Sequence, residues 1–96
     1  MYDLVSTEFF EKKLKRLTKN NILLKDKVRK IFKMLRIDPF YPSLETHKVA
    51  SKNVGEAYSS SVTGDLRIVW DFAKNQTLLI ILLDFGGHSG KHKVYS

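Results

Sequence analysis

The chain has 96 residues, of which 43% are hydrophobic and 28% are charged, and it contains no cysteine. A chain of this length forms one domain around one core, so we expect a single domain over residues 1–96. The apolar content excludes a disordered chain. The absence of cysteine excludes disulfides, thiolate metal sites and cysteine nucleophiles.

The N-terminus and the apolar runs bear on localisation. The segment from Met1 to Lys13 lacks the apolar run of a signal peptide. The longest apolar run, from Leu78 to Leu83, is six residues, far below the roughly 20 residues that span a bilayer. We therefore expect a soluble, cytoplasmic protein with no membrane partner.

The N-terminal half predicts a strand and two helices. Residues 2–6 alternate as in a short strand, and Ser6 or Thr7 can then cap a helix. Apolar residues recur at helical spacing in this first helix, at Phe10, Leu14 and Leu17. They recur again in a second helix, at Leu24, Val28, Ile31 and Leu35. The second helix should end at Asp38, because Pro39 disfavours helical geometry in the residue before it.

This helical hairpin is strongly basic. From Lys12 to Arg36 there are eleven lysines and arginines against a single acid, Asp26, and the whole chain has a formal charge of +7. Such a surface attracts polyanions, because each neutralised phosphate releases counterions. Two alternatives stay open, namely a solvated face that confers solubility and a surface for an acidic protein partner.

From about Thr46 the period of the sequence changes from 3.6 to 2. Four strands are predicted, over His47–Ala50, Ala57–Val62, Leu66–Phe72 and Thr77–Asp84. Their short connections indicate an antiparallel meander. We expect an α+β fold in which an N-terminal strand and a helical hairpin pack on a four-stranded, mainly antiparallel sheet.

Arg67 is the most informative residue of these strands. It lies in an otherwise apolar strand, on the face opposite Ile68 and Trp70, and so should point away from the helices. It is a candidate for binding phosphate. The alternative is an ion pair with Asp71 or Glu56 on an exposed sheet face.

The segment after the last strand also carries functional residue types. The glycines of residues 86–90 permit positive φ angles and close approach of the backbone to a ligand. His88 titrates near neutrality, Lys91 and Lys93 can bind phosphate, and Tyr95 can stack on a base or transfer a proton. The alternative for His88 is a hydrogen-bonded surface residue.

These residues suit the cleavage of RNA without a metal. Three histidines without close carboxylate spacing do not predict a metal site, so we expect no metal and no small-molecule cofactor. Cleavage requires a base for the ribose 2′-OH, a cation for the phosphorane and an acid for the leaving 5′-oxygen. The candidates for proton transfer are His88, Asp65 and His47, and Arg67 suits the phosphate.

A known family shares this arrangement. The basic hairpin, the strand GDLRIVWDF at residues 64–72 and the ending GGHSGKHKVY at residues 86–95 resemble the RelE/ParE toxin superfamily. The sequence is most similar to its YafQ/RelE-type mRNA interferases over essentially the whole chain. The resemblance implies a β-α-α-β-β-β fold, a ribosome-dependent endoribonuclease that cuts mRNA in the ribosomal A site, and a cognate antitoxin. It implies a toxin of a type II toxin–antitoxin system, and we expect the free chain to be a monomer.

The resemblance also implies roles for individual residues. Arg67 matches the strand arginine at the scissile phosphate, and Tyr95 matches the terminal aromatic residue. Asp65 and His88 match an acid and a C-terminal histidine of the YafQ-like branch. His47 lies near a histidine that this branch has before its second strand. Which residue is the base and which is the acid stays open.

The sequence departs from the family pattern in two ways. Ser61 occupies a position where the YafQ-like branch often has a second histidine. The RelE-like branch relies on lysines in its second and third strands, for which Lys48 and Lys52 are candidates. The predicted RNA-binding residues are Lys48, Lys52, Lys91, His92 and Lys93.

Two alternative functions are compatible with these features. ParE-type relatives poison DNA gyrase by binding it and usually lack the pair formed here by His88 and Asp65, so the pair favours a nuclease. The second alternative is an inactive or regulatory module that binds nucleic acid. Such a module would keep the basic helices and tolerate the loss of Arg67 or His88.

Overall fold

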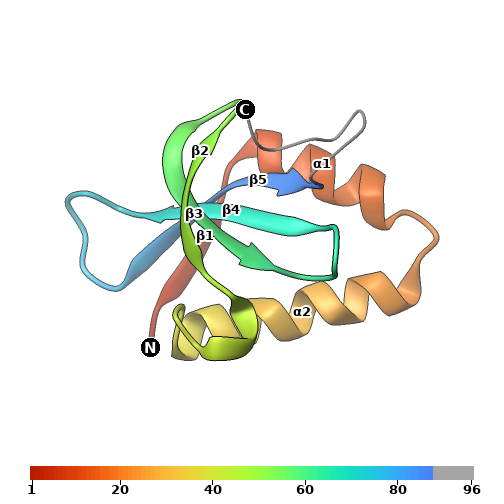
Figure 1. The fold of residues 1–96 in the computed structure, drawn as a ribbon, viewed down its shortest axis with the longest axis horizontal. Coiled ribbons are helices and arrows are strands. Elements are labelled where there is room, and N and C mark those ends of the chain that lie inside the picture. Colours follow the sequence, from red (N-terminus) through yellow and green to blue (C-terminus); the bar gives the residue numbers. More distant parts are fainter. Residues whose placement is uncertain (88–96) are drawn as a thin grey trace.

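A computed structural model describes residues 1–87, and residues 88–96 lie outside the described part. The described residues form a sheet with two long helices on one side (Figure 1). In chain order the elements are β1 (Asp3–Ser6), α1 (Glu8–Thr18), α2 (Ile22–Ile37), the short 3-10 helix η1 (Pro42–Leu44), β2 (His47–Ser51), β3 (Gly55–Ser61), β4 (Arg67–Phe72) and β5 (Leu79–Gly86). The predicted α+β class is confirmed.

The number of strands in the sheet differs from the prediction. Residues 1–87 form a five-stranded sheet in the order β1-β5-β4-β3-β2. The observed order of elements therefore has one strand more than the expected β-α-α-β-β-β pattern. The N-terminal strand is itself part of this sheet, with Asp3 paired in parallel with Leu79. The reason is that β5 is apolar on both faces and lies inside the sheet, where its backbone groups need partners on both edges. The strands β5, β4, β3 and β2 are antiparallel to one another, as predicted.

Local capping explains where the helices begin and end. The Thr7 side chain accepts a hydrogen bond from the backbone N–H of Phe10 at 3.1 Å, so Thr7 caps α1. Asn21 caps α2 in the same way, through the N–H of Leu24 at 3.0 Å. The helix α2 gives way to extended backbone at Asp38, as the following proline predicts.

The two faces of the sheet are covered differently. The helices cover one face and bury the main core, whose largest members are Trp70, Phe10, Phe85, Leu35 and Leu44. The other face carries a smaller cluster, in which Ala57 and Val69 are buried against Val54 and Leu83. Neither helix of residues 1–87 is long and apolar enough to cross a membrane.

Candidate functional site

Arg67 lies on the sheet face that the helices leave uncovered, as predicted. Its neighbour Ile68 belongs to the core under the helices, and side chains alternate between the two faces of a strand. Arg67 is only 7% exposed. Its Nε donates to Ser59 Oγ at 2.7 Å, and its Nη2 donates to the Glu45 carbonyl at 3.0 Å and to the Ser59 carbonyl at 3.3 Å.

Arg67 therefore has neutral partners in the described part of the chain. The ion pairs found within residues 1–87 join Lys13 to Asp84 and Arg29 to Asp26, so the predicted alternative, a bridge from Arg67 to Asp71 or Glu56, does not form. The Nη1 group of Arg67 makes no hydrogen bond to residues 1–87. A buried charge without a counterion is costly.

His47 lies next to this guanidinium. Its Nδ1 is 3.0 Å from the Glu45 carbonyl oxygen and 3.4 Å from Arg67 Nη2. The hydrogens of Nη2 have three neighbours, and the carbonyls of Glu45 and Ser59, at 3.0 Å and 3.3 Å, are closer than His47 Nδ1. His47 Nδ1 consequently donates its own hydrogen to Glu45, since a carbonyl only accepts. In the neutral ring this leaves Nε2 as a proton acceptor.

The strand register brings His47 and Arg67 to the same face. His47 is paired with Ser59, and Ser59 is paired with Val69, two residues along the strand from Arg67. Directly paired residues share a face, as do residues two apart on one strand. The Glu45 carbonyl joins them because Glu45 ends η1 in the left-handed conformation, with φ 49° and ψ 42°.

Asp65 lies where the described chain ends. A Cβ atom built on Gly87 would be 2.6 Å from Asp65 Oδ2, so the carboxylate rests against the backbone at Gly87. Arg67 is paired in the sheet with Gly86, the preceding residue. The backbone that leads to His88 thus passes beside both Asp65 and Arg67. The predicted site residues of the closing segment, His88, Lys91, His92, Lys93 and Tyr95, lie outside the described residues.

The structure does not bring Lys48 and Lys52 to Arg67. Lys48 is paired with Tyr58 on the helix-covered face, and its Nζ lies 5.8 Å from the centre of the Tyr58 ring. Lys52 is an exposed residue of the turn between β2 and β3, at the other end of β2 from His47. Neither is placed to act beside Arg67, and their contact with RNA stays a prediction.

Sequence reasoning missed two partners of the site, Ser59 and the Glu45 carbonyl. The position of Ser59 depends on how β2 and β3 pair, and the direction of the Glu45 carbonyl depends on the backbone angles of Glu45. Local sequence patterns predict neither. Ser61, which replaces the histidine of the YafQ-like branch, is paired with Arg67 and donates to the Thr63 carbonyl at 3.0 Å. It therefore supports the loop that carries Asp65.

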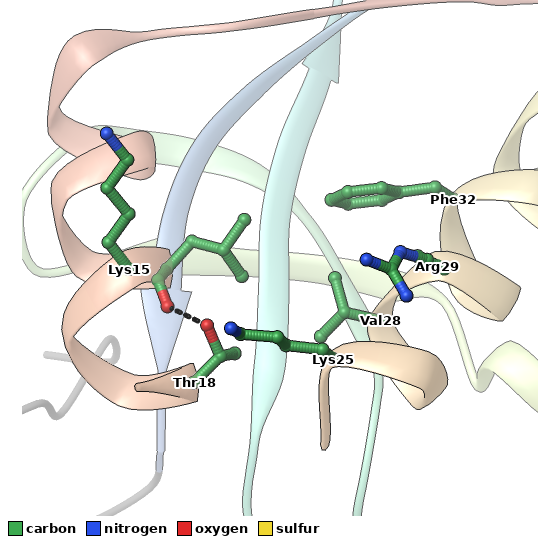
Figure 2. Close-up of a pocket in the computed structure, with 7 residues that line it drawn as sticks. Lys15, Thr18, Lys25, Val28, Arg29 and Phe32 are labelled. Atoms are coloured by element: carbon green, nitrogen blue, oxygen red, sulfur yellow. Dashed lines mark hydrogen bonds between the residues drawn. The ribbon is translucent and has the colours of Figure 1, made fainter. Parts of the chain in front are cut away.

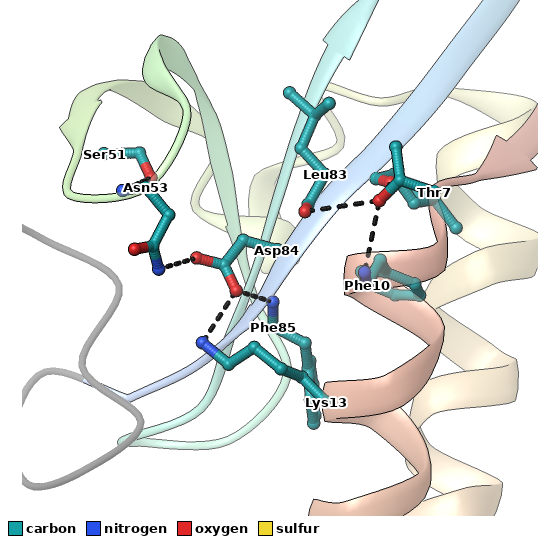
Figure 3. A network of polar contacts seen from close by, with 9 residues as sticks. Thr7, Phe10, Lys13, Ser51, Asn53, Leu83, Asp84 and Phe85 are labelled. Carbon is teal, nitrogen blue, oxygen red and sulfur yellow. Dashed lines mark hydrogen bonds and ion pairs between the residues drawn. The ribbon is translucent and has the colours of Figure 1, made fainter.

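Asp84 belongs to a separate, buried network. Its carboxylate contacts Lys13 Nζ at 2.7 Å, the Phe85 backbone N–H at 2.8 Å and Asn53 Nδ2 at 3.0 Å (Figure 3). The network ties α1 and the turn between β2 and β3 to the end of β5. Asp84 is fully buried, and its role within the described residues is structural.

The basic residues of the hairpin line a second feature, a groove between α1 and α2. It has a volume of about 220 Å³, with Leu14, Val28 and Phe32 among its apolar lining and Lys15, Lys25 and Arg29 around it (Figure 2). The helices cover the sheet face opposite Arg67. The basic surface and the Arg67–His47 pair are therefore on different sides of the molecule.

The sequence matches no family model and no curated protein, whereas the fold has clear neighbours. A metal-bound toxin from Helicobacter pylori superposes with a TM-score of 0.71 and 26% identity, over 92% of this chain and 96% of that one. The E. coli DinJ–YafQ complex superposes with a TM-score of 0.66 and 18% identity, over 92% of this chain and 94% of that one. The YoeB/ParE toxin from Agrobacterium tumefaciens superposes with a TM-score of 0.69 and 13% identity, over 93% of this chain and 100% of that one. In this chain, residues 1–87 contain no cluster of three side chains that could hold a metal ion. The chain thus has the fold of the RelE/ParE-like toxins, as predicted, and its likeness to YafQ is a likeness of fold.

Proposed function

We propose that this chain is the toxin of a toxin–antitoxin system and acts as an endoribonuclease that cleaves mRNA on the ribosome. The observation that carries the proposal is that Arg67, buried without a carboxylate partner in residues 1–87, lies next to His47. Nδ1 of His47 faces the Glu45 carbonyl, so Nε2 is available to accept a proton in the neutral ring. The imidazole and the arginine fork would supply two of the three groups that phosphodiester cleavage requires, the base and the cation.

The proposed reaction is attack by the ribose 2′-oxygen on the adjacent phosphorus. His47 Nε2 accepts the 2′-OH proton as the O2′–P bond forms. The Nη1 hydrogens of Arg67 stabilise the charge that develops on the phosphorane oxygens. The P–O5′ bond then breaks, and the 5′-oxygen takes a proton from the protonated form of Asp65 or of His88. The products are a 2′,3′-cyclic phosphate and a 5′-hydroxyl end.

The neighbours and the surface charge support the proposed partners. Two neighbours are complexes, DinJ–YafQ from E. coli and YoeB–YefM from Staphylococcus aureus, and the former is a toxin–antitoxin complex. We infer a cognate antitoxin for this chain by analogy. The basic residues of the hairpin, of which all but Lys13 are exposed, suit the phosphate backbone of ribosomal RNA.

The proposal is tested by inducing the chain in growing cells and mapping mRNA ends by primer extension. We expect growth arrest and new ends within translated reading frames. The variants Arg67→Ala and His47→Ala should abolish both. Lys74→Ala is the matched control, because Lys74 is an exposed lysine of the turn after β4, at the other end of that strand from Arg67. In vitro, programmed ribosomes should yield fragments with 2′,3′-cyclic phosphate ends.

Binding and poisoning of DNA gyrase is the second candidate, favoured by the neighbour described as a YoeB/ParE toxin. It predicts growth arrest with intact mRNA and a DNA-damage response. It also predicts that Arg67→Ala and His47→Ala remain toxic, since the chemistry would then not be needed. That combination would overturn the nuclease.

A further inference from the structure

A chain of hydrogen bonds lies on the helix-covered face of the sheet, directly behind the Arg67–His47 pair. Trp70 Nε1 donates to Ser60 Oγ at 2.8 Å, Ser60 Oγ and Thr46 Oγ1 are 2.7 Å apart, and Thr46 Oγ1 donates to the Pro39 carbonyl at 2.7 Å. Thr46 has one hydroxyl proton, which the Pro39 carbonyl receives. Ser60 must therefore donate to Thr46, and the direction of every bond in the chain is fixed.

This chain is rigid because its inner members are buried. Trp70 and Ser60 are both 0% exposed. The Trp70 ring is also stacked on Tyr58, with centroids 4.9 Å apart. A hydroxyl held between a buried serine and a backbone carbonyl has one orientation, which fixes Thr46 with respect to the sheet.

The position of Thr46 connects this chain to the site. In the sequence Thr46 lies between Glu45 and His47. The Glu45 carbonyl accepts hydrogen bonds from both His47 and Arg67. Across the strand, Ser59 and Ser60 are also consecutive. Ser59 binds Arg67 on the open face, and Ser60 binds Thr46 on the covered face.

Glu45 needs such support, because its backbone is left-handed at φ 49°. A residue with a Cβ atom adopts this conformation only where its surroundings hold it. On one side the closing turn of η1 holds it, through the bond from its N–H to the Pro42 carbonyl at 3.1 Å. On the other side the next residue is Thr46, locked by its hydroxyl.

We propose that Thr46 is a positioning residue for the Arg67–His47 pair. Its hydroxyl, locked by Ser60 and Trp70, holds the Glu45 carbonyl in place. That carbonyl fixes the Nδ1–H tautomer of His47 and orients Nη2 of Arg67. The expected effect on cleavage rests on the proposed function. The expected effect on the His47 tautomer does not depend on it.

The test compares Thr46→Val, which keeps the shape and removes the hydroxyl, with Thr46→Ser, which keeps the hydroxyl. The ¹⁵N shifts of the His47 ring, measured without RNA at neutral pH, should report Nδ1–H in the wild type and in Thr46→Ser. In Thr46→Val they should report a mixture of tautomers. On programmed ribosomes the single-turnover rate should fall about 10- to 100-fold for Thr46→Val. The toxin concentration at half-saturation should be unchanged, and Thr46→Ser should restore the rate.

The outcomes separate the two proposals. If the wild type leaves mRNA intact but Thr46→Val disturbs the tautomer, the nuclease fails and the positioning role stands. If Thr46→Val retains the tautomer and the rate, or if both substitutions lower the rate equally, the positioning role is overturned while the nuclease stands. Ser60→Ala provides a second variant should Thr46→Val not fold, and it is expected to mix the tautomers in the same way.

Discussion

Replacing Asp84 with alanine should lower the free energy of unfolding by about 3–5 kcal/mol, the cost of breaking a buried ion pair by removing one partner. Asp84 is fully buried, and alanine would leave three donors without an acceptor (Figure 3). One of them is the Lys13 ammonium, whose side chain is only 12% exposed. The other two are the Phe85 N–H and the Asn53 side chain, so we expect a value in the upper half of the range.

The assay is equilibrium unfolding in urea followed by the fluorescence of Trp70, the one tryptophan of the sequence. For a slope near 2 kcal/mol per molar urea, a loss of 4 kcal/mol moves the midpoint down by about 2 M. Asp26→Ala is the surface control, because its pair with Arg29 is exposed, at 52% and 70%. That variant should change stability by less than about 1 kcal/mol.

A double variant decides whether the buried charge is responsible. Lys13→Met combined with Asp84→Leu removes both charges and should recover most of the stability that Asp84→Ala loses. The reasoning is refuted if Asp84→Ala costs less than about 1 kcal/mol. It is also refuted if the double variant is as unstable as the single one.

Three further predictions concern the site. Gly87→Ala forces the Asp65 carboxylate aside and should lower cleavage about tenfold, whereas Gly64→Ala, where an added Cβ meets no atom within 4 Å, should leave cleavage unchanged. Glu45→Gly removes the strain of the left-handed backbone and keeps the carbonyl. Cleavage should therefore persist, and thermal unfolding should show no loss of stability. An inactive Glu45→Gly variant would show that cleavage requires the Glu45 side chain. Arg67→Lys lacks the fork of donors and should lower the rate of single-turnover cleavage about 100-fold. A variant that cleaves at the wild-type rate would show that Arg67 does not take part in the reaction.

Much of the fold could be predicted from local patterns. The alternation around Arg67 correctly placed it on the face opposite Ile68, and Pro39 correctly marked the end of α2. The membership of β1 in the sheet could not be predicted, because its pairing with β5 joins residues far apart in the sequence. That pairing depends on which edge of β5 needs backbone partners.

The candidate site was predicted in part. Arg67, His47 and Asp65 could be named from residue type and resemblance. The role of Ser59 could not be predicted, because a shift of one residue in register would turn it to the other face. The left-handed backbone of Glu45 has no signal either, since glycine or asparagine would be expected there.

The acceptor shared by His47 and Arg67 is a main-chain carbonyl, which has a consequence for how this site can be mapped. Alanine scanning alters side chains and would pass over Glu45 as dispensable. Replacing the amide between Glu45 and Thr46 with an ester weakens the carbonyl as an acceptor while leaving every side chain in place. A backbone-modified protein is therefore the direct way to examine what holds this imidazole and this guanidinium together.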